Sequence, residues 1–211
     1  MKHLIIIGAR GFGRETFSLA KSCEGYGVSF VVKGFLDDKS DALQGFNGYP
    51  PILDSVESYV PGEEDVFICA LGVVKWKKHY ADIILQKGGV FINLIHPSVI
   101  LNDNVRLGIG LIVFHGTFIS NDITIGNFVT IHNYCIFGHD IAIGDWCHIG
   151  AFSFMGGFAM LEEEVTLNVR STVLPKVRVR SKAAVGASSL VIKSVKENTT
   201  VFGSPAQILK F

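Results

Sequence analysis

From Ser98 to Lys193 the sequence repeats every six residues without a gap. The fourth place of all sixteen units is Leu, Ile, Val, Met or Phe, and the second place is apolar or small throughout. A hexapeptide period predicts a parallel β-helix, in which each unit is a short strand with a corner and three units make one triangular coil. Places two and four then point inward and place three outward. Glycine takes place five in seven units, where we expect it to supply the unusual backbone angles of a corner.

Residues 1–96 follow a different pattern, in which short apolar runs alternate with helical segments. Strands are expected at Leu4–Gly8, Val28–Leu36, Asp65–Leu71 and Val90–Ile95, and helices at Phe12–Cys23 and Val73–Gln86. This alternation predicts an α/β unit with a small parallel sheet. It is half-Rossmann-like, because a dinucleotide-binding fold joins two such units. An NAD-dependent oxidoreductase is therefore disfavoured.

Composition narrows the classes of partner. The 211 residues are 48% apolar and carry 19 basic and 19 acidic residues, so the formal net charge is zero. Without a basic run, neither nucleic acid nor an anionic membrane has an electrostatic attachment point. The apolar run Leu4–Ile7 is too short for a membrane span or signal peptide. The four cysteines show neither metal-ligand nor disulfide spacing, so we expect a reduced, cytoplasmic protein.

Five motifs spread over the whole chain resemble those of the left-handed β-helix (hexapeptide) acyltransferases. They are IIIGARGFGRE at the start, GFLDD, LIHPS, GHD, and GSPA near the end. The nearest likeness is to the sialic-acid O-acetyltransferase and UDP-4-amino-sugar N-acetyltransferase group of bacterial surface-glycan synthesis. The left hand of the coil follows from this resemblance alone, since crossover rules favour the other hand. The resemblance implies a nucleotide-sugar-binding domain at 1–96, an acyltransferase β-helix at 97–193 and a capping tail at 194–211.

His139 is the candidate catalytic base. Acyl transfer from a thioester needs a base for the proton of the nucleophile and a donor for the developing oxyanion. His139 ends its unit at a corner, where the imidazole can project outward, and Asp140 follows directly. Spacing alone favours the alternative, a structural corner histidine that bonds a neighbouring carbonyl. The resemblance implies that His139 and Asp140 are the base and its helper.

The resemblance also implies contacts to acetyl-CoA, the expected co-substrate. His148, at an outward place three, corresponds to a contact with the thioester end, and Gly157, Val169 and Ala187 complete this set. His132 departs from the family, which often has Asn there. Lys193 and Lys196 are candidates for the CoA phosphates or are simply solvated. A zinc site, as in β-helix carbonic anhydrases, is disfavoured because no two histidines share a column at 18-residue spacing.

One wall of the predicted prism is apolar on its outer face. Its place-three residues are Ile100, Phe118, Ile136, Phe154, Thr172 and Leu190. An outward apolar stripe on one wall predicts a partner surface, and a triangular prism suggests a closed cyclic trimer. By resemblance, acyl transfer takes place in the cleft between neighbours, with His139 of one chain and His148 of the next facing each other.

The first strand and helix are joined by GARGFG, and the resemblance implies that this segment binds the nucleotide of a sugar-nucleotide acceptor. Backbone amides at a helix start suit a phosphate oxygen, although glycines here also permit a plain tight turn. The predicted substrate-binding residues are Gly8, Arg10, Gly11, Phe12, Gly13, Asp37, Asp38 and Gly72. Phe12 departs from the family, whose members commonly have His there, and Arg10 is a candidate replacement for its positive charge.

Together these observations predict an acetyl-CoA-dependent acetyltransferase acting on a nucleotide-activated sugar. N-acetylation of a 4-amino sugar is preferred. Two alternatives remain open: an O-acetyltransferase of the sialic-acid type and a non-catalytic, nucleotide-sugar-binding trimer. The sequence also leaves open which nucleobase the acceptor carries.

Overall fold

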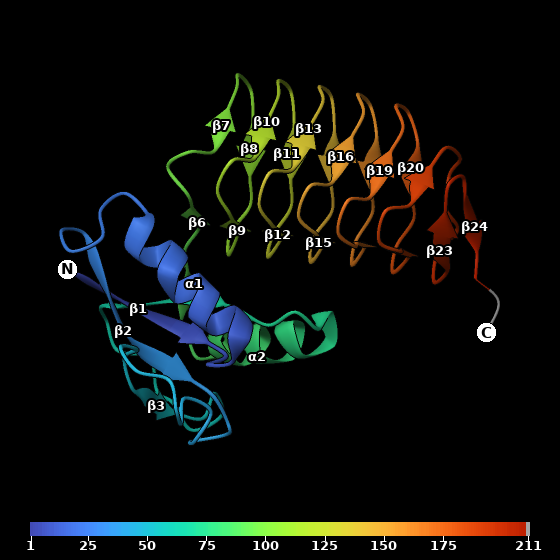
Figure 1. Cartoon of the computed structure of the whole chain (residues 1–211). Coiled ribbons are helices and arrows are strands. Elements are labelled where there is room, and N and C mark those ends of the chain that lie inside the picture. Colours follow the sequence, from blue (N-terminus) through green and yellow to red (C-terminus); the bar gives the residue numbers. More distant parts are fainter. Residues whose placement is uncertain (210–211) are drawn as a thin grey trace. The chain divides into compact units, whose positions relative to one another are not determined.

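The computed structural model describes residues 1–209, which form two compact units (Figure 1). The first unit is Met1–Pro97, and the second begins at Ser98. Among the described residues, no helix is both long enough and apolar enough to cross a membrane.

The first unit contains a parallel sheet in the order β3-β2-β1-β4-β5. Its strands are β1 (Lys2–Ile7), β2 (Phe30–Leu36), β3 (Ile52–Asp54), β4 (Asp65–Cys69) and β5 (Val90–Phe91). The short strand β6 (Leu94–Ile95) follows in the chain and is not part of this sheet. Helix α1 (Gly11–Ser22) joins β1 to β2, and α2 (Val74–Gln86) joins β4 to β5. The strand order reverses between β1 and β4, which is where open α/β sheets bind ligands.

The central strands explain why this sheet forms. Leu4, Ile5, Ile6 and Ile7 of β1 are at most 1% exposed, and all of β4 is buried. Continuous apolar strands are typical of a parallel sheet covered on both faces. The predicted alternation is therefore confirmed, with two differences in detail. Strand β3 was missed because it is short and only partly buried behind Pro50 and Pro51, and the expected strand Val90–Ile95 is divided into β5 and β6.

The second unit is a β-helix of two-residue strands stacked into three walls (Figure 1). The first wall consists of β7 (Ile100–Leu101), β10 (Phe118–Ile119), β13 (Ile136–Phe137), β16 (Phe154–Met155), β19 (Thr172–Val173) and β22 (Leu190–Val191). The second wall consists of β8 (Arg106–Leu107), β11 (Thr124–Ile125), β14 (Ala142–Ile143), β17 (Met160–Leu161) and β20 (Arg178–Val179). The third wall includes β9 (Ile112–Val113), β12 (Thr130–Ile131), β15 (His148–Ile149), β18 (Thr166–Leu167), β21 (Ala184–Val185), β23 (Thr200–Gly203) and β24 (Ala206–Ile208).

The hexapeptide register is confirmed by burial. From Val113 to Val191 every place-four side chain is buried, whereas Leu101 and Leu107 in the first coil are not. Each buried side chain contributes roughly 1.5–3 kcal/mol before the cost of chain entropy, as an upper bound. The fold class is thus as predicted: a half-Rossmann-like parallel sheet followed by a left-handed parallel β-helix.

The role expected of glycine at place five is wrong. The left-handed backbone angles fall at place one, for example at Tyr134 (φ 56°) and Asp140 (φ 57°). Glycine at place five is needed for a different reason, because the next coil passes directly over it. A Cβ on Gly144 would lie 2.8 Å from the carbonyl carbon of Glu162, and one on Gly150 would lie 2.6 Å from the amide nitrogen of Val169.

The β-helix continues beyond Lys193. Val195 pairs with Val179, and Val201 pairs with Val185, so this coil is two residues shorter than those before it. Both valines are buried and take over the inward role of place four. The segment expected as a capping tail therefore extends the second wall at Val195 and the third wall at Val201, and then turns back as the antiparallel strand β24. The last two residues of that segment, 210 and 211, lie outside the described residues.

Asp65, at the start of β4, forms a polar anchor at the amino end of the sheet. Its carboxylate accepts hydrogen bonds from Lys33 Nζ (2.9 Å), Tyr59 Oη (2.7 Å) and the backbone amide of Gly62 (2.8 Å). Burial alone would raise the pKa of Asp65, but the three donors outweigh it and hold this pKa below its ordinary value. The ionised carboxylate is therefore part of the folded structure.

We expect Asp65→Asn to lower the free energy of unfolding by about 1–3 kcal/mol, because the charge that holds Lys33 is lost. The folded-state pKa of Asp65 is depressed, so its stabilisation is present above the unfolded-state pKa of about 3.9 and is lost as the pH falls through the folded-state pKa. Urea unfolding at several pH values measures this, and the gap between wild type and variant should close in acid. As a control, Glu64→Gln removes only an exposed pair with Lys2. A constant gap down to acid would contradict this role.

Candidate functional site

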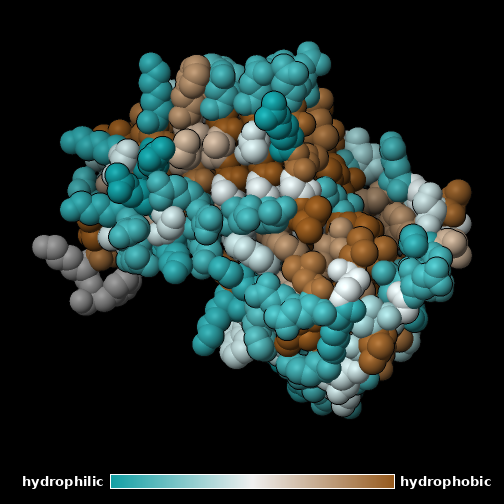
Figure 2. All heavy atoms as spheres, turned by 180° about the vertical axis from the view of Figure 1, so that it is seen from behind, coloured by the Kyte–Doolittle hydropathy of each residue, from teal (hydrophilic) through white to brown (hydrophobic). Residues whose placement is uncertain are grey.

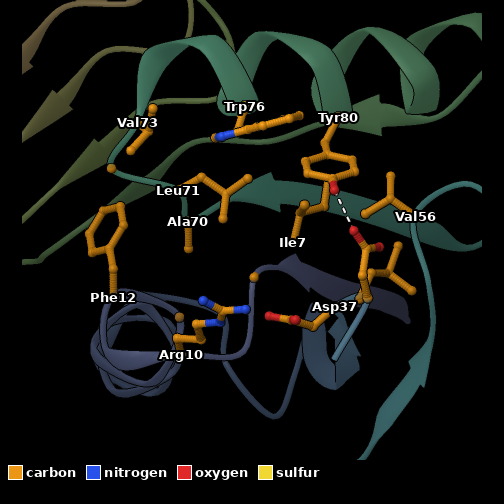
Figure 3. A pocket seen from close by; sticks show the side chains of 15 residues that line it. Ile7, Arg10, Phe12, Asp37, Val56, Ala70, Leu71, Val73, Trp76 and Tyr80 are labelled. Atoms are coloured by element: carbon orange, nitrogen blue, oxygen red, sulfur yellow. Dashed lines mark hydrogen bonds between the residues drawn. The ribbon is translucent and has the colours of Figure 1, made fainter. Parts of the chain in front are cut away.

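A cavity of about 560 Å³ opens at the carboxyl ends of β1, β2 and β4 (Figure 3). Seven of the eight predicted substrate-binding residues line it: Gly8, Arg10, Phe12, Gly13, Asp37, Asp38 and Gly72. The exception is Gly11, the first residue of α1, which instead lines a neighbouring hollow with Arg14 and Phe46. Successive helix residues are rotated by about 100°, so Gly11 points away where Phe12 and Gly13 face the cavity.

Two glycines shape the turn between β1 and α1. Gly8 has a φ of +94°, which favours glycine, and a Cβ on Gly13 would lie only 1.9 Å from the Gly8 carbonyl oxygen. The close approach brings the amino end of α1 against the end of β1. The N-cap residue Arg10 makes no side-chain cap hydrogen bond. The first amides of α1 therefore lie at the cavity edge in the arrangement that binds anions.

The two aspartates after β2 differ in their surroundings. Asp37 accepts hydrogen bonds from the backbone amides of Ala9 (2.9 Å) and Lys39 (3.0 Å), so its carboxylate holds the β1–α1 turn in place. Arg10 and Asp37 point toward each other at the base of the pocket (Figure 3). Asp38 accepts a hydrogen bond from the hydroxyl of Tyr80, which is the dashed line in Figure 3.

Helix α2 supplies cavity residues that the sequence analysis missed. Trp76 and Tyr80 lie one turn apart, their rings stacked with centroids 6.3 Å apart, and both line the cavity. They form an aromatic shelf opposite Arg10 and Asp37 (Figure 3). The detectable signal was the spacing of two aromatic residues by four on a helix that starts at the carboxyl end of a strand.

His139 and Asp140 lie together at the corner between the first and second walls. His139 Nδ1 and Asp140 Oδ2 are 2.6 Å apart, and the two side chains are 58% and 41% exposed. An ionised carboxylate only accepts hydrogen bonds, so Nδ1 is the donor to Asp140, and in the neutral imidazole this leaves the lone pair on Nε2. Asp140 has a left-handed backbone (φ 57°), which Asp tolerates better than most residues.

Gly157 supports the imidazole from the next coil. A Cβ on Gly157 would lie 2.7 Å from His139 Nε2, so only glycine leaves room for the ring in this position. The Phe158 ring meets the imidazole edge-on, with centroids 5.2 Å apart. Gly157, predicted as an acetyl-CoA contact, is thus a neighbour of the candidate base.

The other predicted acetyl-CoA residues lie elsewhere on the prism. His148 is on the third wall, and Val169 and Ala187 are at the corner between the third and first walls. The His132 ring stacks on Phe114, with centroids 5.2 Å apart, and lies 4.9 Å from the His148 ring. Spacing did not reveal the proximity of His132 and His148, because they belong to different columns that meet near a corner. Within residues 1–209, no group of three or more His, Cys, Asp or Glu side chains is placed to hold a metal ion.

The first wall exposes apolar side chains. Ile100, Ile136 and Phe154 are 54%, 49% and 40% exposed, and Phe118 is half-buried. Seen from behind, the β-helix carries a band of apolar side chains between hydrophilic rims (Figure 2). Phe152 and Phe158, at the two corners that border the first wall, add to the exposed apolar surface.

Comparison with known proteins confirms the resemblance in the motifs. Residues 3–84 match the PglD N-terminal domain, and residues 122–157 match the bacterial transferase hexapeptide (six repeats). Comparison with curated proteins gives no match. The first match thus falls within the first unit and the second within the β-helix.

Several solved structures share the fold over nearly the entire chain. PerB from Caulobacter crescentus, in complex with CoA and GDP-perosamine, is 24% identical, with a TM-score of 0.88 over 100% of this chain and 98% of that one. The acetyltransferase domain of PglB from Neisseria gonorrhoeae is 23% identical, with a TM-score of 0.89 over 99% and 100%. WeeI from Acinetobacter baumannii is 24% identical, with a TM-score of 0.83 over 99% and 100%. At these identities the likeness establishes the fold.

We expect Tyr80 to ionise later than an ordinary tyrosine. Its hydrogen bond to Asp38, together with burial, raises the pKa of Tyr80, because a phenolate would face the carboxylate. Burial also raises the pKa of Tyr59, so ultraviolet titration of tyrosinate should show Tyr80 as the last phenol to ionise, well above the usual value of about 10. That phase should disappear in Tyr80→Phe and move down in Asp38→Asn. An unchanged titration curve in Asp38→Asn would show that the hydrogen bond does not govern Tyr80.

Proposed function

We propose that this chain, which joins a PglD N-terminal domain to a hexapeptide-repeat β-helix, is an acetyl-CoA-dependent acetyltransferase that N-acetylates a nucleotide-activated amino sugar. The observation that carries the proposal is the pair His139 and Asp140, whose 2.6 Å hydrogen bond orients an exposed imidazole. PerB, which has the same fold, was solved with CoA and GDP-perosamine, and the PglB domain is named as an acetyltransferase. The product would serve bacterial surface-glycan synthesis.

In the proposed reaction His139 is the general base. Its Nε2 takes a proton from the acceptor amine as the amine nitrogen attacks the thioester carbonyl of acetyl-CoA. The tetrahedral intermediate then expels the CoA thiolate, which receives the proton from the imidazolium, and the amide is formed. Asp140 keeps the proton on Nδ1 and stabilises the imidazolium. Gly157 keeps the space that the ring needs.

The cavity in the first unit is the proposed acceptor site. The first amides of α1 and the Arg10 guanidinium would bind the diphosphate, because both favour anionic oxygen. Asp37 would act indirectly, since its carboxylate is already bonded to the amides of Ala9 and Lys39 and so holds the turn that positions these donors. Phe12 would contact the ligand through its apolar ring.

The proposed active site is shared between subunits of a trimer. The first wall is bordered on one side by the corner with His139 and on the other by the corner with Val169 and Ala187. If the first walls of three chains face a common axis, the His139 corner of one chain adjoins the third wall of its neighbour, which carries His148. Acetyl-CoA would then lie in this cleft, in contact with His148, Gly157, Val169 and Ala187.

We expect His139→Ala to lower kcat by about 10²–10⁴-fold, the range typical of a general base. Asp140→Asn should lower it by about 10–100-fold, as loss of an orienting partner does elsewhere, and Gly157→Ala should impair kcat by displacing the imidazole. Release of CoA thiol with a panel of amino-sugar nucleotides and their hydroxyl counterparts measures this. His3→Ala, on β1 and outside the cavity lining, is the matched control. Full turnover in His139→Ala would refute the mechanism, and turnover with hydroxyl acceptors alone would indicate O-acetylation.

We expect the wild-type chain to sediment as a trimer and Ile136→Glu to dissociate it with loss of activity, because a charge would be buried in the apolar interface. Thr124→Glu is the matched control, since Thr124 is exposed at the same place three on the second wall. Sedimentation velocity at micromolar concentration distinguishes the species. A fully active wild-type monomer would refute the shared site.

A further inference from the structure

The cavity at the carboxyl ends of β1, β2 and β4 contains a carboxylate whose position bears on which nucleobase the acceptor carries. Asp38 lies at the cavity wall two residues after the end of β2, and Tyr80 donates one hydrogen bond to its Oδ2. A carboxylate has about four acceptor positions. Within residues 1–209, Tyr80 is the hydrogen-bond donor found at this carboxylate. The remaining acceptor positions are therefore available to a ligand.

The surroundings of Asp38 suit a flat aromatic ring. Trp76 and Tyr80 form a shelf along one side of the cavity, and Leu36 and Val56 add apolar surface. A nucleobase lying against such a shelf presents its edge, not its face, to groups at the margin. The diphosphate end of the ligand is assigned to the amino end of α1, which leaves the shelf and Asp38 to the nucleoside.

The hydrogen-bonding pattern of a carboxylate discriminates between bases. Its two oxygens accept and never donate. Guanine presents two adjacent donors, N1–H and the N2 amino group, which pair with both oxygens at once. Uracil and thymine present a single N3–H between two carbonyl oxygens, and those oxygens would be repelled by the carboxylate. Cytosine and adenine place an acceptor nitrogen beside their amino group.

We propose that the acceptor carries guanosine and that Asp38 reads the N1–H and N2 amino donors of the guanine ring. This inference rests on the proposed function and specifies the nucleotide class of the same site. Tyr80 is a positioning residue, because its hydroxyl holds the Asp38 carboxylate in the orientation that the base meets. Asp37 is instead assigned to holding the β1–α1 turn, because each of its oxygens accepts a hydrogen bond from a backbone amide.

The test is calorimetric binding of GDP, IDP and UDP to the full chain. IDP differs from GDP only by the missing N2 amino group. We expect GDP to bind at least about tenfold more tightly than IDP and UDP, because a bidentate pair discriminates between bases by about that factor or more. Asp38→Asn replaces one acceptor by a donor, so it should weaken GDP binding and reduce or reverse the preference over UDP. Asp82→Asn, an exposed position on α2, is the matched control.

Other outcomes would overturn the proposal. Equal or tighter binding of UDP to the wild-type chain would exclude guanine reading while leaving the proposed acetyltransferase intact. An equal loss for all three nucleotides in Asp38→Asn would place Asp38 on the ribose, which they share. If no nucleoside diphosphate binds, both this inference and the assignment of the cavity as acceptor site are wrong. Thiol release from acetyl-CoA with a sugar acceptor separately tests whether the chain is an enzyme at all.

Discussion

The stacking of identical coils is the constraint on which the β-helix depends. Each coil pairs with the next at a fixed offset, as Phe118 does with Ile136 and Ile136 with Phe154. The offset places buried side chains over buried side chains, so the core is a set of continuous apolar columns. It also decides which corner residues meet across coils. His139 lies over Gly157 because the two are one coil apart, and any shift in register would separate them.

The same stacking explains the unusual corners. From Asn104 to Ser188 every residue in place one adopts left-handed angles, including bulky residues such as Trp146 (φ 63°) and Phe152 (φ 61°). For a residue with a Cβ this conformation costs about 1–2 kcal/mol. The cost is offset by the two inward side chains of each unit. Ring stacking at the corners adds to the compensation: Phe128 and Trp146 are parallel within 1°, with centroids 4.2 Å apart.

In the α/β unit, residues that are neighbours in the sequence have different structural roles at the cavity. Asp37 is tied to the backbone and shapes the turn, whereas Asp38 is held by a single hydroxyl and borders the cavity. Likewise Gly8 and Gly13 are required by backbone geometry, whereas Gly11 meets no such restriction, since a Cβ there would contact nothing within 4 Å. The glycines of this motif therefore have different structural roles, because each one lies against different neighbouring atoms.

The sequence alone determined the period of the second half, the inward and outward places, the apolar first wall and the adjacency of His139 and Asp140. These features follow from local spacing, because strand alternation and a fixed repeat convert sequence distance directly into direction and height. Tertiary structure decided what depends on distant segments meeting. It showed that place-five glycines clear the next coil, that Trp76 and Tyr80 complete the cavity, and that His132 approaches His148. It also revealed the shortened coil that ends with Val201, since a two-residue change in length is recognised only when the partner strand is known. Contacts between segments far apart in the chain have no single period, and for that reason only the folded chain reveals them.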